Sequence, residues 1–391
     1  MNLLEQLPLI TAPGSESASS DATEAAAFAG GREAREFVLR DLALRDLMAS
    51  RSYYLVDVRS PAEFTEDHIP EARSVPLFSD QERAVVGTLY RHAGPGAARA
   101  WGEDRVVARL AGYFAEMCEA FDLDATGQPR ANPTWPRVIA CARGGQRSQA
   151  VADWLQGRGV AVRRLVGGYR SYRATVRNEL RRVRIPRPIV LHGLTGVGKT
   201  HVLRAVAAAL PGQVLDLEAL AGHRSSLLGD IGLIPASQKL FESRLARAIA
   251  NLTGPFTLCE WEGRRIGDRE LPLEVYQQLQ RATHVCLEAR IDQRVDLLCR
   301  EYLSVGGVEE VTQRLAGLER CETLGIQGVS EVVALLRAGE ISSAVRRLLV
   351  EHYDPRYLHS QQHLSCARRF ALTTIPDTAR AIVEWSEEHV R

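Results

Sequence analysis

The run IVLHGLTGVGKT, residues 189–200, constrains this chain more than any other stretch of its sequence. A short apolar segment leads into a glycine-rich loop, and the spacing G-x-x-x-x-G-K-T predicts a strand, a phosphate-binding loop and the start of a helix. Glycines allow successive backbone N–H groups to approach an anion, and the N-terminal end of the following helix also favours negative charge. We therefore predict a diphosphate or triphosphate site formed by Gly193, Leu194, Thr195, Gly196, Val197, Gly198, Lys199 and Thr200.

Lys199 stands out because the chain takes nearly all its positive charge from arginine. Lys199 and Lys239 are the only lysines in the sequence. A lysine at the end of a glycine loop supplies a point charge to the phosphates, and the hydroxyl that follows is suited to Mg²⁺. The arginine-rich background does not explain this lysine, so Lys199 is predicted to act on the diphosphate and Thr200 to bind Mg²⁺.

Length and composition indicate an ordinary soluble globular protein. The 391 residues suffice for two or three domains, and 45% of them are hydrophobic. The net charge of +1 means that any contact with nucleic acid must come from local clusters. The seven cysteines are odd in number and show no C-x-x-C pair, which favours a reducing compartment and gives no zinc signature. With no signal peptide and no long apolar run, we expect a cytoplasmic protein with no membrane partner.

The first domain shows an α/β pattern with a long helical insertion. Residues 38–48 have helical spacing, and residues 53–58 read as a buried strand that ends at Asp57. Asp57 and Arg59 are predicted to pair at the strand end, and His68 to hold a turn. A second strand runs into Val75, and residues 79–134 are predicted to be a helical insertion.

A second loop with chemical character follows the strand at residues 137–140. It reads CARGGQRS, residues 141–148, and leads into a helix at 149–156. A cysteine between a strand end and a helix start, next to Arg143 and Arg147, has surroundings that stabilise a thiolate and bind an oxyanion. We predict that Cys141 is a reactive, exposed thiol, whereas the other six cysteines lack such surroundings and belong in the core.

A basic helix is predicted from residue 169 to about 182. Its arginines are spaced by three, four and four residues, which places them on one helix face: Arg170, Arg173, Arg177 and Arg181. This face is predicted to contact nucleic-acid phosphates; the alternative is a solvated linker helix.

From residue 185 the pattern is that of a parallel sheet flanked by helices. Apolar strands at Val190, 214–217, 256–259 and 285–287 alternate with helical stretches, which indicates a P-loop NTPase-like domain. Acidic residues after the second and third strands are candidates for binding Mg²⁺ or acting as a general base. They are chiefly Asp216 and Glu260, with Glu218 and Glu262 beside them. Two polar connections are predicted to bring basic side chains to the phosphates: His223, Arg224, Arg264 and Arg265. Residues 290–391 read as amphipathic helices, with a turn at 353–355.

Four runs, DVRSPAEF, HIPEA, VIACARGGQRS and LVGGYRSY, resemble the strand end, turn and active-site loop of a rhodanese domain. That resemblance implies sulfur or selenium transfer at Cys141, although such loops also occur in phosphatases and in inactive binding modules. With LDLEALAGHRSSLLG, SQKLFES, EWEGRRIG and EHYDPRY, residues 40–357 resemble the tRNA 2-selenouridine synthase family. The expected organisation is a mobile tail at 1–36, a rhodanese-like domain at 37–184, a P-loop domain at 185–305 and a helical part at 306–391.

The resemblance implies a bacterial, cytoplasmic enzyme that acts on tRNA carrying wobble 2-thiouridine. It implies selenophosphate as selenium donor and an S-geranyl intermediate made from geranyl diphosphate, with Mg²⁺ as the expected cofactor. The chain departs from the family pattern at Ala142, where tryptophan is common, and at Gly263, where serine is usual. An alternative is an ATP-dependent sulfurtransferase that delivers sulfur from a Cys141 persulfide. A third is that the rhodanese part is a phosphate-binding docking module.

Overall fold

The computed structural model describes residues 53–131, 135–226, 228–260, 263–303, 307–316, 324–361 and 365–390. The chain divides into two compact units, residues 1–175 and 176–391, each of which is considered by itself. The tail predicted at 1–36 and the helix predicted at 38–48 lie outside the described residues. Among the helices of the described ranges, none combines the length and the apolar character needed to cross a membrane.

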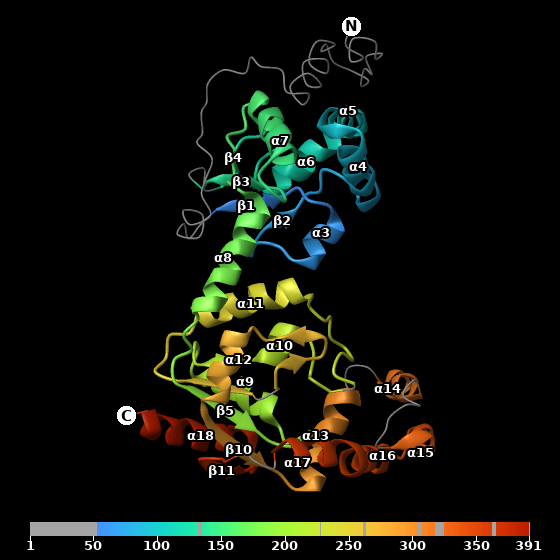
Figure 1. Ribbon diagram of the computed structural model, residues 1–391, viewed down its shortest axis with the longest axis vertical. Coiled ribbons are helices and arrows are strands. Elements are labelled where there is room, and N and C mark those ends of the chain that lie inside the picture. The colour runs from blue at the N-terminus through green and yellow to red at the C-terminus, as the bar shows by residue number, and fades with distance from the viewer. Residues whose placement is uncertain are drawn as a thin grey trace. The chain divides into compact units, whose positions relative to one another are not determined.

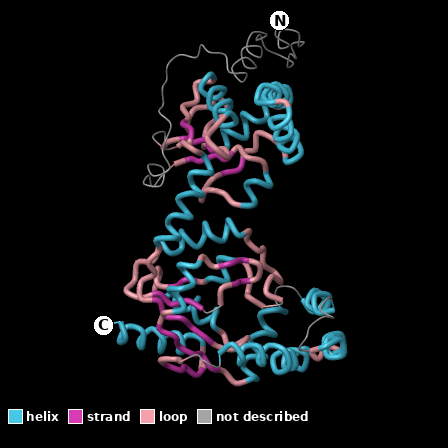
Figure 2. Tube along the Cα trace, in the orientation of Figure 1, coloured by secondary structure: helices cyan, strands magenta, loops and turns pink. Residues whose placement is uncertain are grey.

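The first unit is built on a four-stranded parallel sheet (Figures 1 and 2). The strand order is β2-β1-β3-β4, formed by β1 (Tyr54–Asp57), β2 (Arg73–Ser74), β3 (Arg137–Ala140) and β4 (Arg163–Arg164). The β1–β3 register pairs Asp57 with Ala140, so the strand-end residues Asp57 and Cys141 leave the sheet at the same edge. Strands β1 and β3 confirm the predicted strands at 53–58 and 137–140. Buried apolar runs of this length are typical of parallel strands.

Helices cover this sheet and fill the predicted insertion. They are α3 (Pro61–Glu66), α4 (Asp80–His92), α5 (Gly94–Val107), α6 (Leu110–Ala120) and α7 (Gln146–Gly157). A capping box fixes the start of α4, since the Ser79 side chain accepts from the Glu82 N–H and the Glu82 carboxylate accepts from the Ser79 N–H. The core of the unit gathers Met117, Phe121, Ile139 and Trp154, all with essentially no exposed surface.

The second unit is built on a five-stranded parallel sheet in the order β11-β10-β5-β7-β6. The strands are β5 (Pro188–His192), β6 (Val214–Leu215), β7 (Thr257–Glu260), β10 (Thr283–Glu288) and β11 (Arg368–Ala371). The predicted parallel sheet is confirmed. The predicted strand at 214–217 is too long, because the Asp216 side chain accepts from the Ala219 N–H and thereby starts a helix.

Helices and one hairpin complete the second unit. The helices before the C-terminal part are α9 (Lys199–Ala209), α10 (Leu217–Ala221), α11 (Gln238–Ala250) and α12 (Leu273–Gln280). The C-terminal part contains α13 (Ile291–Leu303), α14 (Gly307–Ala316), α15 (Gly325–Arg337), α16 (Ile341–Leu348), the π-helix η2 (Leu349–Tyr353), α17 (Asp354–Gln361) and α18 (Ile375–Val390). An antiparallel hairpin, β8 (Arg265–Ile266) with β9 (Arg269–Glu270), occupies the connection that was predicted to be a loop.

The C-terminal residues differ from the prediction in two places. Strand β11 pairs with β10 and α18 packs Ile382 and Trp385 into the core of the sheet, so residues 368–390 complete the P-loop fold instead of forming only helices. The turn predicted at 353–355 is a continuous passage from η2 into α17. Pro355 is accommodated there because the first turn of a helix does not need its N–H.

The cysteines are partly as predicted. Cys118 and Cys259 are buried core residues, whereas Cys299 is only partly buried. Cys286 and Cys366 are joined in a disulfide, which the sequence interpretation did not anticipate. Cys366 lies two residues before β11 and Cys286 lies in β10, so the pairing of these strands brings the two side chains together. Cys321 lies outside the described residues.

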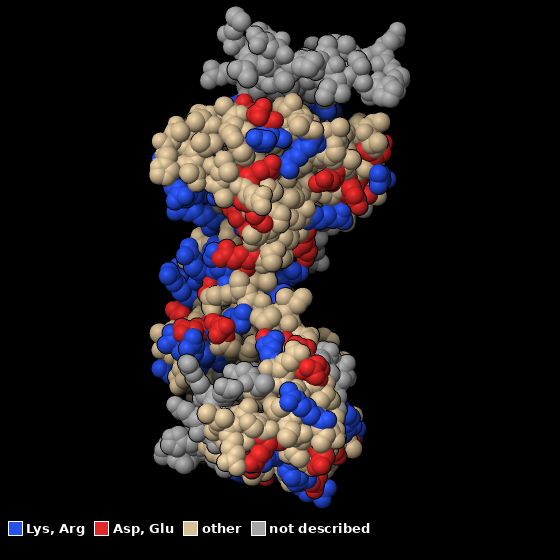
Figure 3. Space-filling model, turned by 90° about the vertical axis from the view of Figure 1, so that its right-hand side faces the viewer, with Lys and Arg blue, Asp and Glu red and all other residues tan. Residues whose placement is uncertain are grey.

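Helix α8 (Gly168–Arg182) contains the division between the two units and confirms the predicted basic helix. The amphipathic pattern is strong: Tyr172, Val176 and Leu180 are buried, and Arg170, Arg177 and Arg181 are exposed. Elsewhere on the face shown in Figure 3, basic and acidic side chains are interspersed, as expected from the near-zero net charge.

Candidate functional site

The cysteine loop begins where β3 ends. Cys141 is only 3% exposed, so the prediction of an exposed thiol is wrong. Its Sγ lies 3.2 Å from the Ser148 Oγ, and that hydroxyl in turn donates to the Gly145 carbonyl at 3.1 Å. The thiol therefore sits inside the loop, with the Ser148 hydroxyl within hydrogen-bond distance of its sulfur.

The first turn of α8 is what encloses this loop. Tyr169 and Arg170 donate their backbone N–H groups to the carbonyls of Cys141 and Ala142, at 2.9 and 3.0 Å. Gly168 has a φ of +54°, and a Cβ there would lie 2.1 Å from the Cys141 carbonyl oxygen. Only glycine permits both this backbone conformation and this approach, and the close approach buries Cys141.

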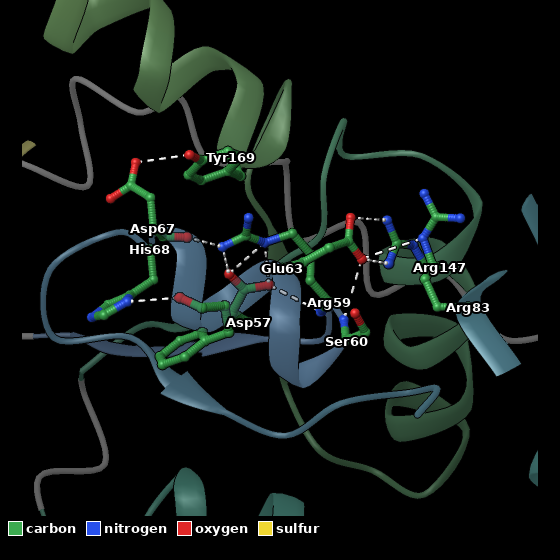
Figure 4. A network of polar contacts seen from close by, with 10 residues as sticks. Asp57, Arg59, Ser60, Glu63, Asp67, His68, Arg83, Arg147 and Tyr169 are labelled. Atoms are coloured by element: carbon green, nitrogen blue, oxygen red, sulfur yellow. Dashed lines mark hydrogen bonds and ion pairs between the residues drawn. The ribbon is translucent and has the colours of Figure 1, made fainter. Parts of the chain in front are cut away.

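The two arginines of the cysteine loop have different surroundings. Arg143 is exposed, whereas Arg147 donates to the Glu63 carboxylate at 2.8 Å (Figure 4). Burial alone would raise the pKa of Glu63, but the hydrogen bond and charge of Arg147, with the charge of Arg83, lower it to about 2. Glu63 therefore stays ionised and holds the Arg147 guanidinium in one orientation.

A buried polar network supports the strand end next to the loop (Figure 4). Arg59 pairs with Asp57 at 2.6 Å and lies over the Tyr169 ring, with 3.8 Å between guanidinium carbon and ring centroid. The Tyr169 hydroxyl donates to Asp67 at 2.7 Å, and burial together with that bond raises the pKa of Tyr169. His68 contacts the Phe64 carbonyl at 3.0 Å. The predicted structural roles of Asp57, Arg59 and His68 are confirmed.

The four arginines predicted on one face of α8 separate into two environments. Arg173 is 9% exposed and forms an ion pair with the buried Asp67 at 3.6 Å. At about 100° per residue, Arg170, Arg177 and Arg181 fall within an arc of about 40°, and Arg173 lies beyond it toward the buried face. An exposed stripe thus contains Arg170, Arg177 and Arg181 but not Arg173.

The phosphate loop follows β5 as predicted, and α9 begins at Lys199. Gly198 precedes the helix with a φ of +91°, a conformation that favours glycine. The Lys199 Nζ donates to the Gly193 carbonyl at 3.0 Å, which folds the side chain back over the loop. Its charge is therefore held beside the backbone N–H groups that would bind phosphate.

Two carboxylates meet the hydroxyl of the loop. The Thr200 Oγ lies 3.0 Å from Glu218 and 3.4 Å from Glu260, and the Glu218 N–H donates to Glu260 at 3.0 Å. Glu260 reaches this place because β7 ends beside β5, where the register pairs Glu260 with Leu191. Asp216 instead caps α10, and Glu262 lies outside the described residues.

This donor set suits a hard cation. Carboxylate and hydroxyl oxygens are what Mg²⁺ prefers, and it usually completes its shell with waters and substrate phosphates instead of an all-protein cage. Across the described ranges, no group of three or more His, Cys, Asp or Glu side chains is arranged to hold a metal ion. The oxygens of Thr200, Glu218 and Glu260 are thus of the kind that Mg²⁺ prefers, but they do not by themselves form a complete metal site.

A pocket opens over the phosphate loop. Arg224 reaches it and is held by Glu301, with 2.8 Å between Nε and carboxylate. The residues lining the pocket are Thr195, Gly196, Val197, Gly198, Lys199, Thr200, His201, Glu218, Arg224, Ser226, Leu297, Leu298, Glu301 and Tyr357. Of the basic residues predicted to bind diphosphate from the two connections, Arg224 alone is in this lining.

The other predicted basic residues lie elsewhere. Arg264 and Arg265 are on or next to the β8–β9 hairpin, with exposed side chains that face Glu270 at 3.7 and 3.9 Å. The His223 ring packs against Gly267 of the same hairpin and against Gly229, and burial lowers its pKa. His223 therefore links the hairpin to the segment that carries Arg224.

Several pocket residues come from the C-terminal part of the chain, for which the sequence analysis predicted amphipathic helices but no site residue. Leu297, Leu298 and Glu301 lie on α13, and Tyr357 lies on α17. The Tyr357 ring centroid is 5.7 Å from the Lys199 Nζ. The only signal for Tyr357 was its position in the EHYDPRY run, and Glu63 similarly was only part of DVRSPAEF.

The fold and the two loops define the class: an α/β chain with a rhodanese-like cysteine loop and a separate P-loop domain. A family model described as "Rhodanese-like domain" matches residues 42–175. A second, described as "tRNA 2-selenouridine synthase AAA domain", matches residues 186–391.

Curated relatives agree over most of the chain. The tRNA 2-selenouridine synthase of Pseudomonas entomophila (strain L48) is 34% identical over 341 residues, covering 79% of this chain and 87% of the relative. That of Pseudomonas aeruginosa (strain LESB58) is 35% identical, covering 79% and 88%. That of Cupriavidus pinatubonensis (strain JMP 134 / LMG 1197) is 31% identical, covering 85% and 94%. The chain belongs to the tRNA 2-selenouridine synthase family.

Proposed function

We propose that this chain converts the wobble 2-thiouridine of tRNA into 2-selenouridine with selenophosphate, through an S-geranyl-2-thiouridine made from geranyl diphosphate. The observation that carries the proposal is membership of the tRNA 2-selenouridine synthase family across both units. The cysteine loop and the phosphate loop, on which the two chemical steps would depend, are both intact in this chain.

A prenyl diphosphate fits the character of the pocket over the phosphate loop. Lys199, Thr200 and Arg224 supply donors for a diphosphate, while Leu297 and Leu298 provide an apolar wall directly beside them. A ligand with one polyanionic end and one hydrocarbon end would satisfy both parts of the lining. This support is strongest for the geranyl diphosphate part of the proposal.

In the first step, the thiouridine sulfur attacks the allylic carbon that carries the diphosphate. A carbon–sulfur bond forms, the carbon–oxygen bond breaks, and diphosphate departs with the bonding electrons. Lys199 and Arg224 would stabilise the negative charge that develops on the leaving group. Mg²⁺, when bound by Thr200, Glu218 and Glu260, would supply further positive charge.

In the second step, alkylation has made the sulfur a leaving group. Selenium from selenophosphate attacks C2 of the base, and geranyl thiolate departs with the bonding electrons as the carbon–sulfur bond breaks. Water then cleaves the phosphorus–selenium bond, which releases phosphate and leaves the selenium on C2. Cys141 would bind the selenium of selenophosphate for this attack, and Arg143 and Arg147 would bind the oxyanion of selenophosphate. Of these two arginines, Arg147 is held by Glu63 and Arg143 is exposed.

The tRNA would be bound partly through helix α8. The exposed stripe of Arg170, Arg177 and Arg181 presents three charges on one helix face, which suits contact with a phosphate backbone. Arg173 is excluded from this role because it is buried against Asp67.

Mass spectrometry of nucleosides tests the proposal directly. Thiolated tRNA is incubated with the protein and with geranyl diphosphate, selenophosphate or both. S-geranyl-2-thiouridine is expected with geranyl diphosphate alone, and 2-selenouridine with both substrates. A parallel mixture holds unthiolated tRNA, ATP and a sulfur donor. Sulfur transfer there, without any geranylation of thiolated tRNA, would instead favour the sulfurtransferase alternative, and no modification in any mixture would favour a docking module.

A further inference from the structure

Arg294, on α13, makes contacts that connect the phosphate loop to the C-terminal helices. Its Nε donates to the Thr195 carbonyl at 2.9 Å, and its two terminal nitrogens donate to the Asp354 carboxylate at 2.9 and 2.5 Å. Arg294 is 3% exposed. Thr195 is inside the phosphate loop, so one guanidinium joins that loop to the first residue of α17.

The same segments line the ligand pocket. Helix α13 packs closely on the loop, since a Cβ at Gly196 would lie 2.8 Å from the Leu298 side chain and 3.1 Å from the Arg294 carbonyl. Helix α17, whose first residue is Asp354, carries Tyr357 to 5.7 Å from the Lys199 Nζ. It follows a π-helix, a departure from regular geometry that is frequent near functional sites.

We infer that Arg294 is a positioning residue for diphosphate binding, and that Asp354 orients it. A guanidinium offers a planar fork of donors, so the bidentate pair with Asp354 fixes the plane in which Nε meets Thr195. The pair thereby holds the phosphate-loop backbone in its binding conformation and keeps α17 in place beside Lys199. This inference rests on the proposed function in so far as the loop binds a diphosphate.

A purely structural role for the ion pair makes a different prediction. Replacing both members of a buried ion pair by apolar residues of similar volume is often neutral for stability, whereas removing one leaves an uncompensated charge. The double variant Arg294→Met/Asp354→Leu therefore removes the positioning contact without stranding a charge. If the pair serves only stability, this variant binds ligand like the wild-type protein.

The test is calorimetric titration of the full chain with inorganic pyrophosphate and Mg²⁺, alongside its thermal unfolding. We expect the double variant to unfold within a few degrees of wild type but to bind pyrophosphate at least about tenfold more weakly, as found when supporting contacts of a site are lost. Equal affinity in a stable double variant would overturn the inference. If the double variant does not fold, Arg294→Lys decides by the same criterion, because lysine keeps a charge for Asp354 but lacks the fork that also reaches Thr195.

Two control variants accompany the titration. Asp292→Asn breaks an exposed ion pair between α13 and Arg346 of α16 and touches no part of the loop, so wild-type affinity is expected. An equal loss in this control would overturn the inference, since any disturbance of α13 would then suffice. Lys199→Ala checks the premise: if it leaves pyrophosphate binding unchanged, the diphosphate site itself is wrong, a failure distinct from that of Arg294.

Discussion

Cys141 is enclosed by the loop that it belongs to, so a substitution there changes packing as well as chemistry. Cys141→Ala is expected to abolish 2-selenouridine formation while S-geranyl-2-thiouridine still accumulates, because the role proposed for the thiol is in the second step alone. Loss of a buried thiol should also cost about 1 kcal/mol of stability. Nucleoside mass spectrometry and thermal unfolding measure the two effects.

Cys118→Ala is the matched control for that variant. Cys118 has the same 3% exposure and lies in the same core cluster, but it is remote from the loop in sequence and chemistry. It should lose similar stability and keep full selenation. Undiminished selenation by Cys141→Ala would remove Cys141 from the mechanism.

Lys199→Ala should stop the first step. In the proposed first step its charge would neutralise the departing diphosphate, and loss of one such group typically lowers the rate by at least about a hundredfold. Lys239→Ala, on the exposed start of α11, should geranylate normally. A Lys199→Ala protein that still geranylates but has lost ATP hydrolysis would favour the sulfurtransferase alternative.

The residues that sequence reasoning placed correctly are those whose role depends on local sequence. The phosphate loop and the Asp57–Arg59 pair are set by neighbours a few residues away, and buried apolar runs identified β1, β3, β5 and β7. Residues brought to a site by distant packing gave no such signal. Tyr357 and Arg294 reach the phosphate loop only through the packing of α13 and α17, and helix capping by Asp216 decides that Glu218, not Asp216, faces Thr200.

At the scale of elements, β11 shows why a strand can escape prediction. Its sequence RRFA has one buried residue, Phe370, and three exposed ones, so it has neither the apolar run of a central strand nor a clear alternation. In the sheet that the described residues form, β11 is an edge strand that pairs with β10 alone. Edge strands commonly carry charged side chains, so their sequences are less apolar than those of central strands. The thiol burial was missed for a related reason, because the glycine–arginine loop gives no sign that α8 folds over it.

The junction of α8 with the cysteine loop should be sensitive to a single methyl group. Gly168→Ala must place a Cβ 2.1 Å from the Cys141 carbonyl oxygen at a positive φ, so we expect a loss of about 3 kcal/mol or more, with selenation lost. Gly159→Ala is the comparison: φ is +80°, but nothing lies within 4 Å of the added Cβ. It should cost only about 1 kcal/mol, and chemical denaturation distinguishes the two. Equal losses would show that backbone conformation alone matters.

The exposed stripe of α8 predicts a salt effect on tRNA binding. Arg177→Ala/Arg181→Ala should weaken binding and lower the slope of log K against log salt by about one unit per lost phosphate contact. KM for tRNA should rise while affinity for geranyl diphosphate stays the same. Tyr169→Phe, which removes the bond to Asp67 but no charge, is expected to keep the wild-type slope. An unaltered slope in the double variant would identify the stripe as a solvated face.

At the scale of the whole molecule, the two units should respond differently to acid. The second unit contains three histidines, His192, His223 and His352, whose pKa values burial lowers; that of His192 falls to about 3, also through the charges of His284 and Lys199. In the first unit, the lowered pKa of Glu63 is about 2. Below about pH 6.5 these histidines take up protons in the unfolded chain but not in the folded one, so the second unit loses stability. The first unit loses the stability that ionised Glu63 contributes only below about pH 4.5, where this carboxylate is protonated in the unfolded chain.

Calorimetric scans between pH 7 and pH 5 measure this difference. His192 alone should lower the free energy of unfolding of the second unit by about 2 kcal/mol at pH 5, since the unfolded state binds a proton at His192 that the folded state does not. We expect the transition of the P-loop unit to move to lower temperature while that of the rhodanese-like unit stays nearly constant. His192→Asn should reduce this shift, and a first unit that responds as strongly as the second would contradict the assignment.

The scarcity of lysine makes the phosphate loop accessible to amine chemistry. An acylating reagent meets only two side-chain amines: Lys199, half-buried and folded onto the Gly193 carbonyl, and Lys239, exposed on α11. The label on Lys239 is then an internal standard within every molecule, and the ratio of the two labelled peptides reports how fully the loop is occupied. Any diphosphate that protects Lys199 could thus be ranked by competition, without a radioactive substrate, a tRNA or a catalytic assay.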